Sequence, residues 1–260
     1  MDTSLLSAWF SSIPLGILVF TRVTALFVFS QVIGDIHTPN VTKALLGLAV
    51  TLIIVPLAAA SHPQVIPLDG SFLVLLMREI LVGLSMGLLA NCYFLGVRLG
   101  GDLINRHAGF SAAENFDPET ESVIGPIGDV MHFAIMVLFF AADGHHLFFA
   151  ALARSYDVLP IGSWQLTAAY GHALSQAVND MSVIAMAISF PVLTAVLAVT
   201  LVEGVVTRAV PQINIMHVSF AVKIVLSLVV MSAGLPATVA FLGTVVRAAQ
   251  QVGITSAGLM

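Results

Sequence analysis

The sequence has too few charged residues to cover the surface of a soluble protein. Of its 260 residues, 9% are charged and 58% are hydrophobic, whereas a soluble domain usually carries roughly a quarter charged residues. Much of its surface must therefore face lipid or other proteins. The net charge is only -5 and there is no tract of basic residues, so we expect no nucleic-acid partner.

Cysteine is nearly absent, and several enzyme motifs are missing. Cys92 is the only cysteine, which excludes an intramolecular disulfide. The chain has no phosphate-binding loop and no His-Glu-x-x-His pattern, and we expect neither an enzyme nor a cofactor. Residues 1–12 contain no Lys or Arg, so the first apolar stretch is expected to be a retained helix rather than a secretory signal.

Long apolar runs are what the chain has in abundance. Runs of about 18 residues or more predict membrane-spanning helices, and they are too continuous for the alternating strands of a membrane barrel. Pro191 is expected to kink or divide the fifth run, and Pro236 to break the sixth. The six runs lie near 13–30, 41–60, 72–97, 124–152, 166–203 and 216–248.

Several charged residues fall inside or next to these runs. Charges within a membrane are costly, and they indicate either an ion pathway or pairing between helices. Because the chain shows no repeated acidic relay, we favour pairing. The residues concerned are Arg22, Arg78, Glu79, Glu203 and Lys223.

Asp143-Gly144-His145-His146 interrupts the fourth apolar run. A metal site, with Asp129 and His132 as further ligands, is one interpretation. Adjacent histidines on a helix point about 100° apart and seldom share one ion. We therefore expect a structural polar motif that interrupts the helix, and no metal.

The stretch from Arg98 to Ser122 is the most polar part of the chain. Gly100 and Gly101 predict flexibility there, and Asp117-Pro118 predicts a turn. A plain solvent loop and a loop that lines or blocks a cavity are equally compatible with this composition. Elsewhere, the Gly-x-x-x-Gly spacings at 83–87 and 96–100 predict close helix packing.

Five short segments, taken in order, resemble the bacterial flagellar biosynthesis protein FliR family. One departure is Asp143, where the family usually has asparagine. The departures leave open whether the chain serves a flagellum or the homologous injectisome. The segments are Gly109-Phe110-Ser111, Phe116-Asp117-Pro118, Asp143-Gly144-His145, Leu159-Pro160-Ile161-Gly162 and residues 208–215.

The resemblance implies an all-α, multi-helix integral membrane protein of the bacterial inner membrane, at the flagellar basal body. It implies a subunit of the type III export gate that assembles with FliP, FliQ and FlhB and contacts lipid. Unfolded flagellar proteins would be exported through the gate. Residues 1–180 would be FliP-like, and residues 181–260 would form a FliQ-like helical hairpin and a C-terminal tail.

The resemblance also implies roles for particular residues. A plug loop near 106–123 would close the channel, with Gly100, Gly101 and Gly109 as hinges. Its gating residues would be Arg106, Gly109, Phe110, Ser111, Phe116, Asp117 and Pro118. The hairpin tip, which would contact partners, would include Glu203, Arg208, Pro211 and Gln212.

A function from another class is a small-solute or ion transporter. Arg22, Glu79 or Asp180 would then act as coupling groups. Paired broken helices in two inverted repeats would favour this alternative, but the expected breaks at Pro191 and Pro236 both lie in the last part of the chain.

Overall fold

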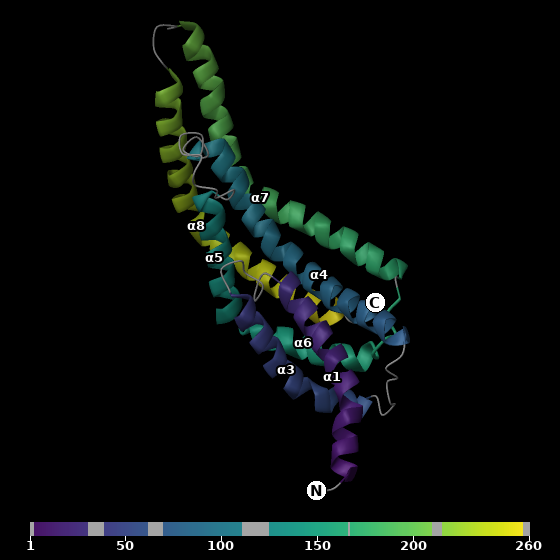
Figure 1. The fold of residues 1–260 in the computed structure, drawn as a ribbon. Coiled ribbons are helices and arrows are strands. Elements are labelled where there is room, and N and C mark those ends of the chain that lie inside the picture. Colours follow the sequence, from purple (N-terminus) through teal and green to yellow (C-terminus); the bar gives the residue numbers. More distant parts are fainter. Residues whose placement is uncertain are drawn as a thin grey trace. The chain divides into compact units, whose positions relative to one another are not determined.

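A computed structural model of the chain describes residues 3–30, 39–61, 70–110, 125–165, 167–209 and 215–256. Within these ranges the secondary structure consists of helices, and no strand is present (Figure 1). The predicted all-helical fold class is confirmed, and each of the six apolar runs lies on one or two helices. The helices are α1 (Thr3–Phe29), α3 (Asn40–Ser61), α4 (Gly70–Ala108), α5 (Pro126–Ala141), α6 (Gly144–Val158), α7 (Ala168–Ala209) and α8 (Ile215–Ser256).

Four of the described helices are long and apolar enough to cross a membrane, and α5 and α6 taken together would make a fifth. The four segments are Val41–Ala59, Ser71–Ala108, Ala168–Ala209 and Val218–Val252. Most of their residues are not buried inside the chain. The protein is therefore a multi-pass membrane protein whose helices present apolar side chains outward.

Helix α4 is longer than the sequence suggested. The polar stretch was expected to leave the helix at Arg98, but α4 continues to Ala108. Arg98, Asp102 and Arg106 are spaced by four residues, so they lie along one side of the helix. The expected loop at 98–108 is thus wrong, because periodic polar residues can occupy one face of a continuing helix.

Clustering of the backbone separates two units. The first consists of residues 1–92, 143–177 and 248–260, and the second of residues 93–142 and 178–247. Helices α4, α7 and α8 contribute to both units. In the first unit α1 packs on α3. The buried residues of α1 include Leu18, Val23 and Phe27.

Glycines allow close approach of α4 to α1 in the first unit. A Cβ atom on Gly83 would overlap the carbonyl oxygen of Arg22, and one on Gly87 would lie 3.0 Å from the carbonyl oxygen of Leu26. The predicted close packing at 83–87 is confirmed. Backbones approach this closely only where the side chain is absent.

The second unit uses the other glycine pair in the same way. A Cβ atom on Gly96 would lie 2.8 Å from the carbonyl oxygen of Met181, and one on Gly100 would lie 3.0 Å from Ile188. Gly100 and Gly101 are buried inside α4. The expectation that they form a hinge is therefore wrong, because they are packing residues within a continuous helix.

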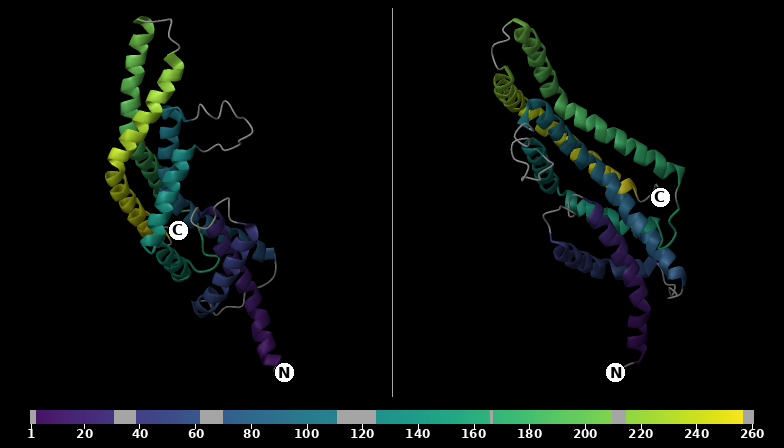
Figure 2. Two further views of the ribbon diagram at one scale, coloured as in Figure 1. Left: turned by 90° about the vertical axis from the view of Figure 1, so that its left-hand side faces the viewer. Right: turned by 45° about the horizontal axis from the view of Figure 1, so that its top comes forward.

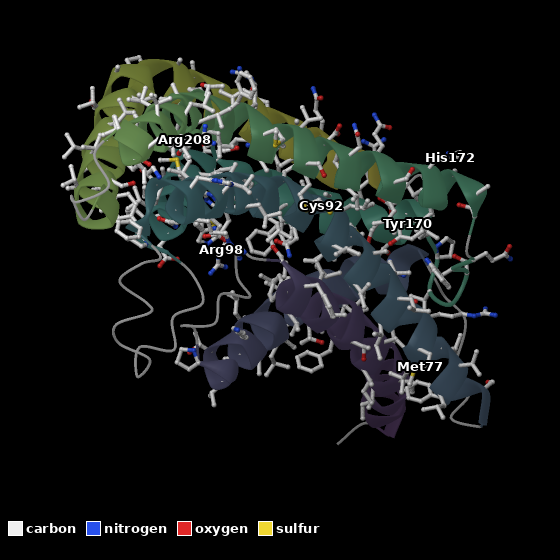
Figure 3. The ribbon with its side chains drawn as sticks, turned by 90° about the horizontal axis from the view of Figure 1, so that it is seen from above. Met77, Cys92, Arg98, Tyr170, His172 and Arg208 are labelled. Atoms are coloured by element: carbon white, nitrogen blue, oxygen red, sulfur yellow. The ribbon has the colours of Figure 1, made fainter. Side chains whose placement is uncertain are left out.

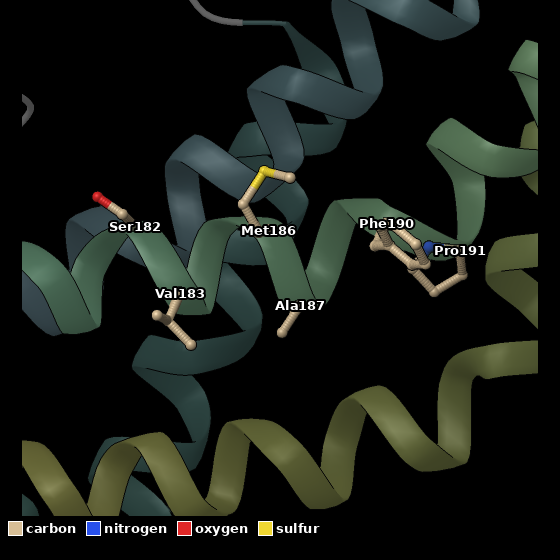
Figure 4. A pocket seen from close by; sticks show the side chains of 6 residues that line it. All are labelled: Ser182, Val183, Met186, Ala187, Phe190 and Pro191. Carbon is tan, nitrogen blue, oxygen red and sulfur yellow. The ribbon is translucent and has the colours of Figure 1, made fainter.

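Helices α7 and α8 run side by side in the second unit (Figures 1 and 2). Pro191 does not divide α7, but the helix turns visibly at Phe190 and Pro191 (Figure 4). The hydroxyl of Thr194 donates to the carbonyl oxygens of both residues, at 2.9 Å each. The backbone group that Pro191 leaves without its helical N–H donor is the carbonyl of Ala187, so these two bonds are additional contacts at the kink. Pro236 likewise lies inside a continuous helix, α8.

We predict that Gly83→Ala lowers the melting temperature of the purified chain in detergent. The added methyl overlaps the α1 backbone, and overpacking of this kind costs about 1–3 kcal/mol. Gly171→Ala is the matched control, because nothing lies within 4 Å of a Cβ at that position. Equal melting temperatures for the two variants would show that the α1–α4 contact is not tight.

Candidate functional site

A fully buried ion pair joins α1 and α4 in the first unit. Arg22 Nε lies 2.6 Å from Glu79 Oε2, and Arg22 Nη2 donates to Glu79 Oε1 at 3.2 Å. Both side chains are 0% exposed. Two parallel hydrogen bonds of this type are the strongest arrangement of guanidinium and carboxylate. The predicted pairing of buried charges is confirmed here.

Helix α6 and its connection to α7 complete this network. Arg22 also donates to the hydroxyl of Ser155 at 3.2 Å and to the carbonyl oxygen of Leu159 at 3.2 and 3.3 Å. The backbone N–H of Gly162 donates to Glu79 at 2.9 Å. The pair therefore bonds directly to the Leu159–Gly162 segment.

Two further contacts involve the Leu159–Gly162 segment and the neighbouring part of α6. Arg78 donates to the carbonyl oxygen of Gly162. The guanidinium carbon of Arg22 lies 4.2 Å from the centre of the Tyr156 ring, as in a cation–π contact. Gly162 has a backbone φ of +77°, an angle that residues other than glycine rarely adopt.

Sequence patterns did not predict that the Leu159–Gly162 segment bonds to the ion pair. The Leu-Pro-Ile-Gly segment was noticed only through the family resemblance. No spacing rule links it to Arg22 or Glu79, since more than 80 residues separate Gly162 from Glu79. A glycine after a proline-containing turn was the only local signal.

The segment Asp143-Gly144-His145-His146 interrupts the helix as predicted. Helix α5 ends at Ala141 and α6 begins at Gly144, which is buried. Asp143 stands between them in the left-handed region, with φ 54° and ψ 27°. Asn and Asp are the side chains that tolerate this conformation best. His145 is half-buried, and its ring centre lies 4.3 Å from that of His146.

The two flanks of residues 111–124 meet in the second unit. The side-chain oxygen of Asn105, near the end of α4, accepts a hydrogen bond from the N–H of Ile127, near the start of α5, at 3.1 Å. Gly125 lies against the Asn105 side chain, and a Cβ on Gly101 would lie 2.6 Å from Gly128. Asn105 thus caps the neighbouring helix, a role that its own sequence position did not reveal.

Three of the predicted gating residues can be placed. Arg106 is exposed in the last turn of α4. Gly109 follows the helix with a φ of +89° and packs against the ring of Phe220. Phe110 is half-buried. Ser111, Phe116, Asp117 and Pro118 lie outside the described residues, and the plug role of the segment stays a prediction.

The hairpin of α7 and α8 carries a second ion pair. Lys223 Nζ lies 2.9 Å from Glu203 Oε2, which confirms the pairing predicted for these charges. Arg208 is exposed in the last turn of α7 (Figure 3). Pro211 and Gln212 lie outside the described residues. The partner-contact role of the hairpin tip stays a prediction.

Apolar grooves lie on the same hairpin. One is lined on α7 by Ser182, Val183, Met186, Ala187, Phe190 and Pro191 (Figure 4). A second groove lies between the last part of α7 and the first part of α8. It is lined by Ala198, Val199, Val202, Glu203, Val206, Val218, Ser219 and Val222. Their lining is almost wholly apolar, so helices or lipid chains suit them better than polar solutes.

Two groups with potential chemistry are held in structural contacts. Asp180 accepts a hydrogen bond from the hydroxyl of Tyr93 at 3.0 Å.

Residues 83–87 match the Gly-x-Ser-x-Gly pattern of hydrolase nucleophiles. The Ser85 hydroxyl, however, is buried within α4 and donates to Val82. The hydrolase motif needs a strand-to-helix turn that exposes the serine, so the match carries no catalytic role.

Comparisons with known proteins agree on one family. Residues 13–251 match the family described as bacterial export proteins, family 1. The chain is 28% identical to flagellar biosynthetic protein FliR of Bacillus subtilis (strain 168), over 84% of this chain and 85% of that protein. It is 26% identical to flagellar biosynthetic protein FliR of Escherichia coli (strain K12), over 88% and 87%.

We predict that Arg22→Met strongly destabilises the chain, because it leaves the Glu79 carboxylate buried without its partner. Breaking a buried pair from one side costs about 3–5 kcal/mol. Thermal unfolding of the purified chain in detergent measures the loss. The double variant Arg22→Met/Glu79→Leu should recover much of it.

Arg98→Met is the control for this prediction. Arg98 lies 4.0 Å from Asp129, whose side chain is 62% exposed, and exposed pairs contribute about 0–1 kcal/mol. If Arg22→Met and Arg98→Met unfold at the same temperature, the buried network does not hold the first unit together.

Proposed function

The chain belongs to the bacterial export proteins of family 1, the FliR family, and from that membership we propose that it forms part of the channel wall of the flagellar export gate. As a FliR-family member it is a multi-pass membrane subunit of the flagellar protein export apparatus. In the proposed role, unfolded flagellar subunits pass through the channel, and residues 106–123 close it while no substrate is present.

The observation that carries the proposal is the joining of the two flanks of residues 111–124. The Asn105–Ile127 hydrogen bond and the close Gly101–Gly128 approach hold the end of α4 beside the start of α5. In the proposed role this joined base keeps the two ends of the closing element beside each other. A closing element in an export gate needs such a fixed base.

Gly109 supplies the conformational freedom at one end of the base. Its φ of +89° is accessible to glycine at little cost and strained for other residues. Gly100 and Gly101 do not take part, because both are packed inside α4. Of the three glycines named as hinges, the proposal therefore keeps Gly109.

The outward apolar surface supports assembly with other subunits. Exposed apolar side chains on α7 and α8 include Leu197, Leu201, Val205, Val225 and Val229. We propose FliP, FliQ and FlhB as the partners that cover such surfaces. In this proposal residues 1–180 are FliP-like, and residues 181–260 are the FliQ-like hairpin and tail.

The proposed location is the bacterial inner membrane, within the flagellar basal body. Much of the apolar surface would then face partner helices rather than lipid. In this proposal the number of apolar helices need not equal the number of bilayer crossings in the assembled gate. The alternative is a transporter. The three residues named as its coupling groups are all engaged in contacts, Arg22 with Glu79 and Asp180 with Tyr93.

We predict that deletion of residues 110–120 makes the gate permeable to small ions, because the closing element is lost while its base stays joined. Conductance of membranes that contain the purified export gate measures this. A variant with the same residues replaced by Gly and Ser keeps the length and tests the side chains alone. Normal permeability in an intact, deletion-bearing complex would contradict the plug role.

We also predict that Leu201→Arg together with Val205→Arg blocks assembly, because both side chains are exposed on the apolar face of α7. Charges placed there would have to be buried against a partner helix. Co-expression with the neighbouring export proteins and gel filtration of the complex report the outcome. A complex of unchanged size and yield would place the partner surface elsewhere.

A further inference from the structure

Three side chains with metal-ligating atoms meet where α5 gives way to α6. Asp143, His145 and His146 each offer one donor atom within 4.8 Å of the other two. Among the residues that the structure describes, this is the one group of three or more such side chains. We propose that these three residues bind a divalent transition-metal ion, of which zinc is the type.

The helix break brings the three donors together. The argument that successive side chains diverge by about 100° holds within a regular helix. Asp143 precedes the helix in the left-handed region, and its carbonyl oxygen accepts from the N–H of His146 at 3.0 Å. The carboxylate is thereby placed beside the first turn of α6. The group arises from the interruption itself, which is why helical spacing did not predict it.

The donor set selects the class of metal. Two imidazole nitrogens and one carboxylate oxygen are ligands that zinc, cobalt and nickel accept. Magnesium and calcium prefer sets made entirely of oxygen. Bonds of about 2.0–2.1 Å place the ligand atoms of one ion roughly 3–4 Å apart, so modest side-chain rotations close the group. Three protein ligands leave a position for water or a partner's side chain.

Charge and access both allow an ion to bind. In the isolated chain Asp143 and His146 are exposed and His145 is half-buried, so an ion can reach the group in the purified protein without unfolding of the chain. The N-terminus of α6 disfavours a cation, and the negative charge of Asp143 offsets this. An asparagine at this position would lack that charge. The site is therefore expected in chains that combine aspartate with both histidines.

A bound ion would fix Asp143 to the first turn of α6. Since the left-handed conformation of Asp143 is sparsely populated in isolation, a metal bridge would hold the helix start in one arrangement. This inference concerns the break alone and does not depend on the gating proposal.

The test is metal binding to the full-length chain, purified in detergent with a tag that contains no histidine. We expect about one zinc ion per chain by calorimetry, and a cobalt complex with absorption bands in the visible range. Asp143→Asn should weaken zinc binding by at least about tenfold, since even loss of groups behind the ligands costs about 10–100-fold. Zinc should raise the melting temperature of the parent chain and not of this variant.

Two further variants make the result decisive. Asn tolerates the left-handed conformation, so Asp143→Asn keeps the helix break, and His146→Gln removes an exposed ligand without touching the backbone. His172→Gln, at an exposed histidine of α7, is the control and should bind zinc as the parent does. Equal zinc affinity in all four proteins, or no binding by the parent, would overturn the proposal.

Discussion

The buried pair of Arg22 and Glu79 is the interaction on which the first unit depends. A charge in an apolar interior is tolerated only when it is paired and its remaining hydrogen-bonding groups are satisfied. Here the guanidinium and the carboxylate bond to each other and to the Leu159–Gly162 segment. Three parts of the chain that are far apart in sequence must therefore fold together. If any one of them were missing, a polar group in the apolar interior would lack its partner.

Close helix packing supplies the second constraint. Apolar helices gain little from burial against each other in an apolar surrounding, so association rests on contact between backbones and on polar bonds. Helix α4 carries one glycine pair for each unit, Gly83/Gly87 and Gly96/Gly100, and each pair meets the backbone or Cβ of another helix. The same helix supplies Glu79 to the ion pair and Asn105 to the start of α5.

Features with a local cause could be predicted from the sequence. Apolar runs gave the helices, Asp143-Gly144 gave the break, and the glycine spacing gave the close contacts. The identity of the partners of Arg22 could not be predicted, because pairing across 57 and 137 residues is fixed by tertiary packing. The end of α4 was misplaced because Gly100 and Gly101 resemble a flexible link in sequence while packing requires small residues there. The cap by Asn105 lacked any local signal.

The placement of the charges bears on how the protein can work. A transporter needs ionisable groups that gain and lose partners during its cycle. In this chain Arg22, Glu79, Glu203 and Lys223 are held in ion pairs that join helices, so releasing them would loosen the fold instead of moving a solute. Charges fixed in this way suit a wall that stays in place while something else moves past it. In the proposed role, the closing element is residues 106–123, and the Asn105–Ile127 hydrogen bond joins the two helices that flank it.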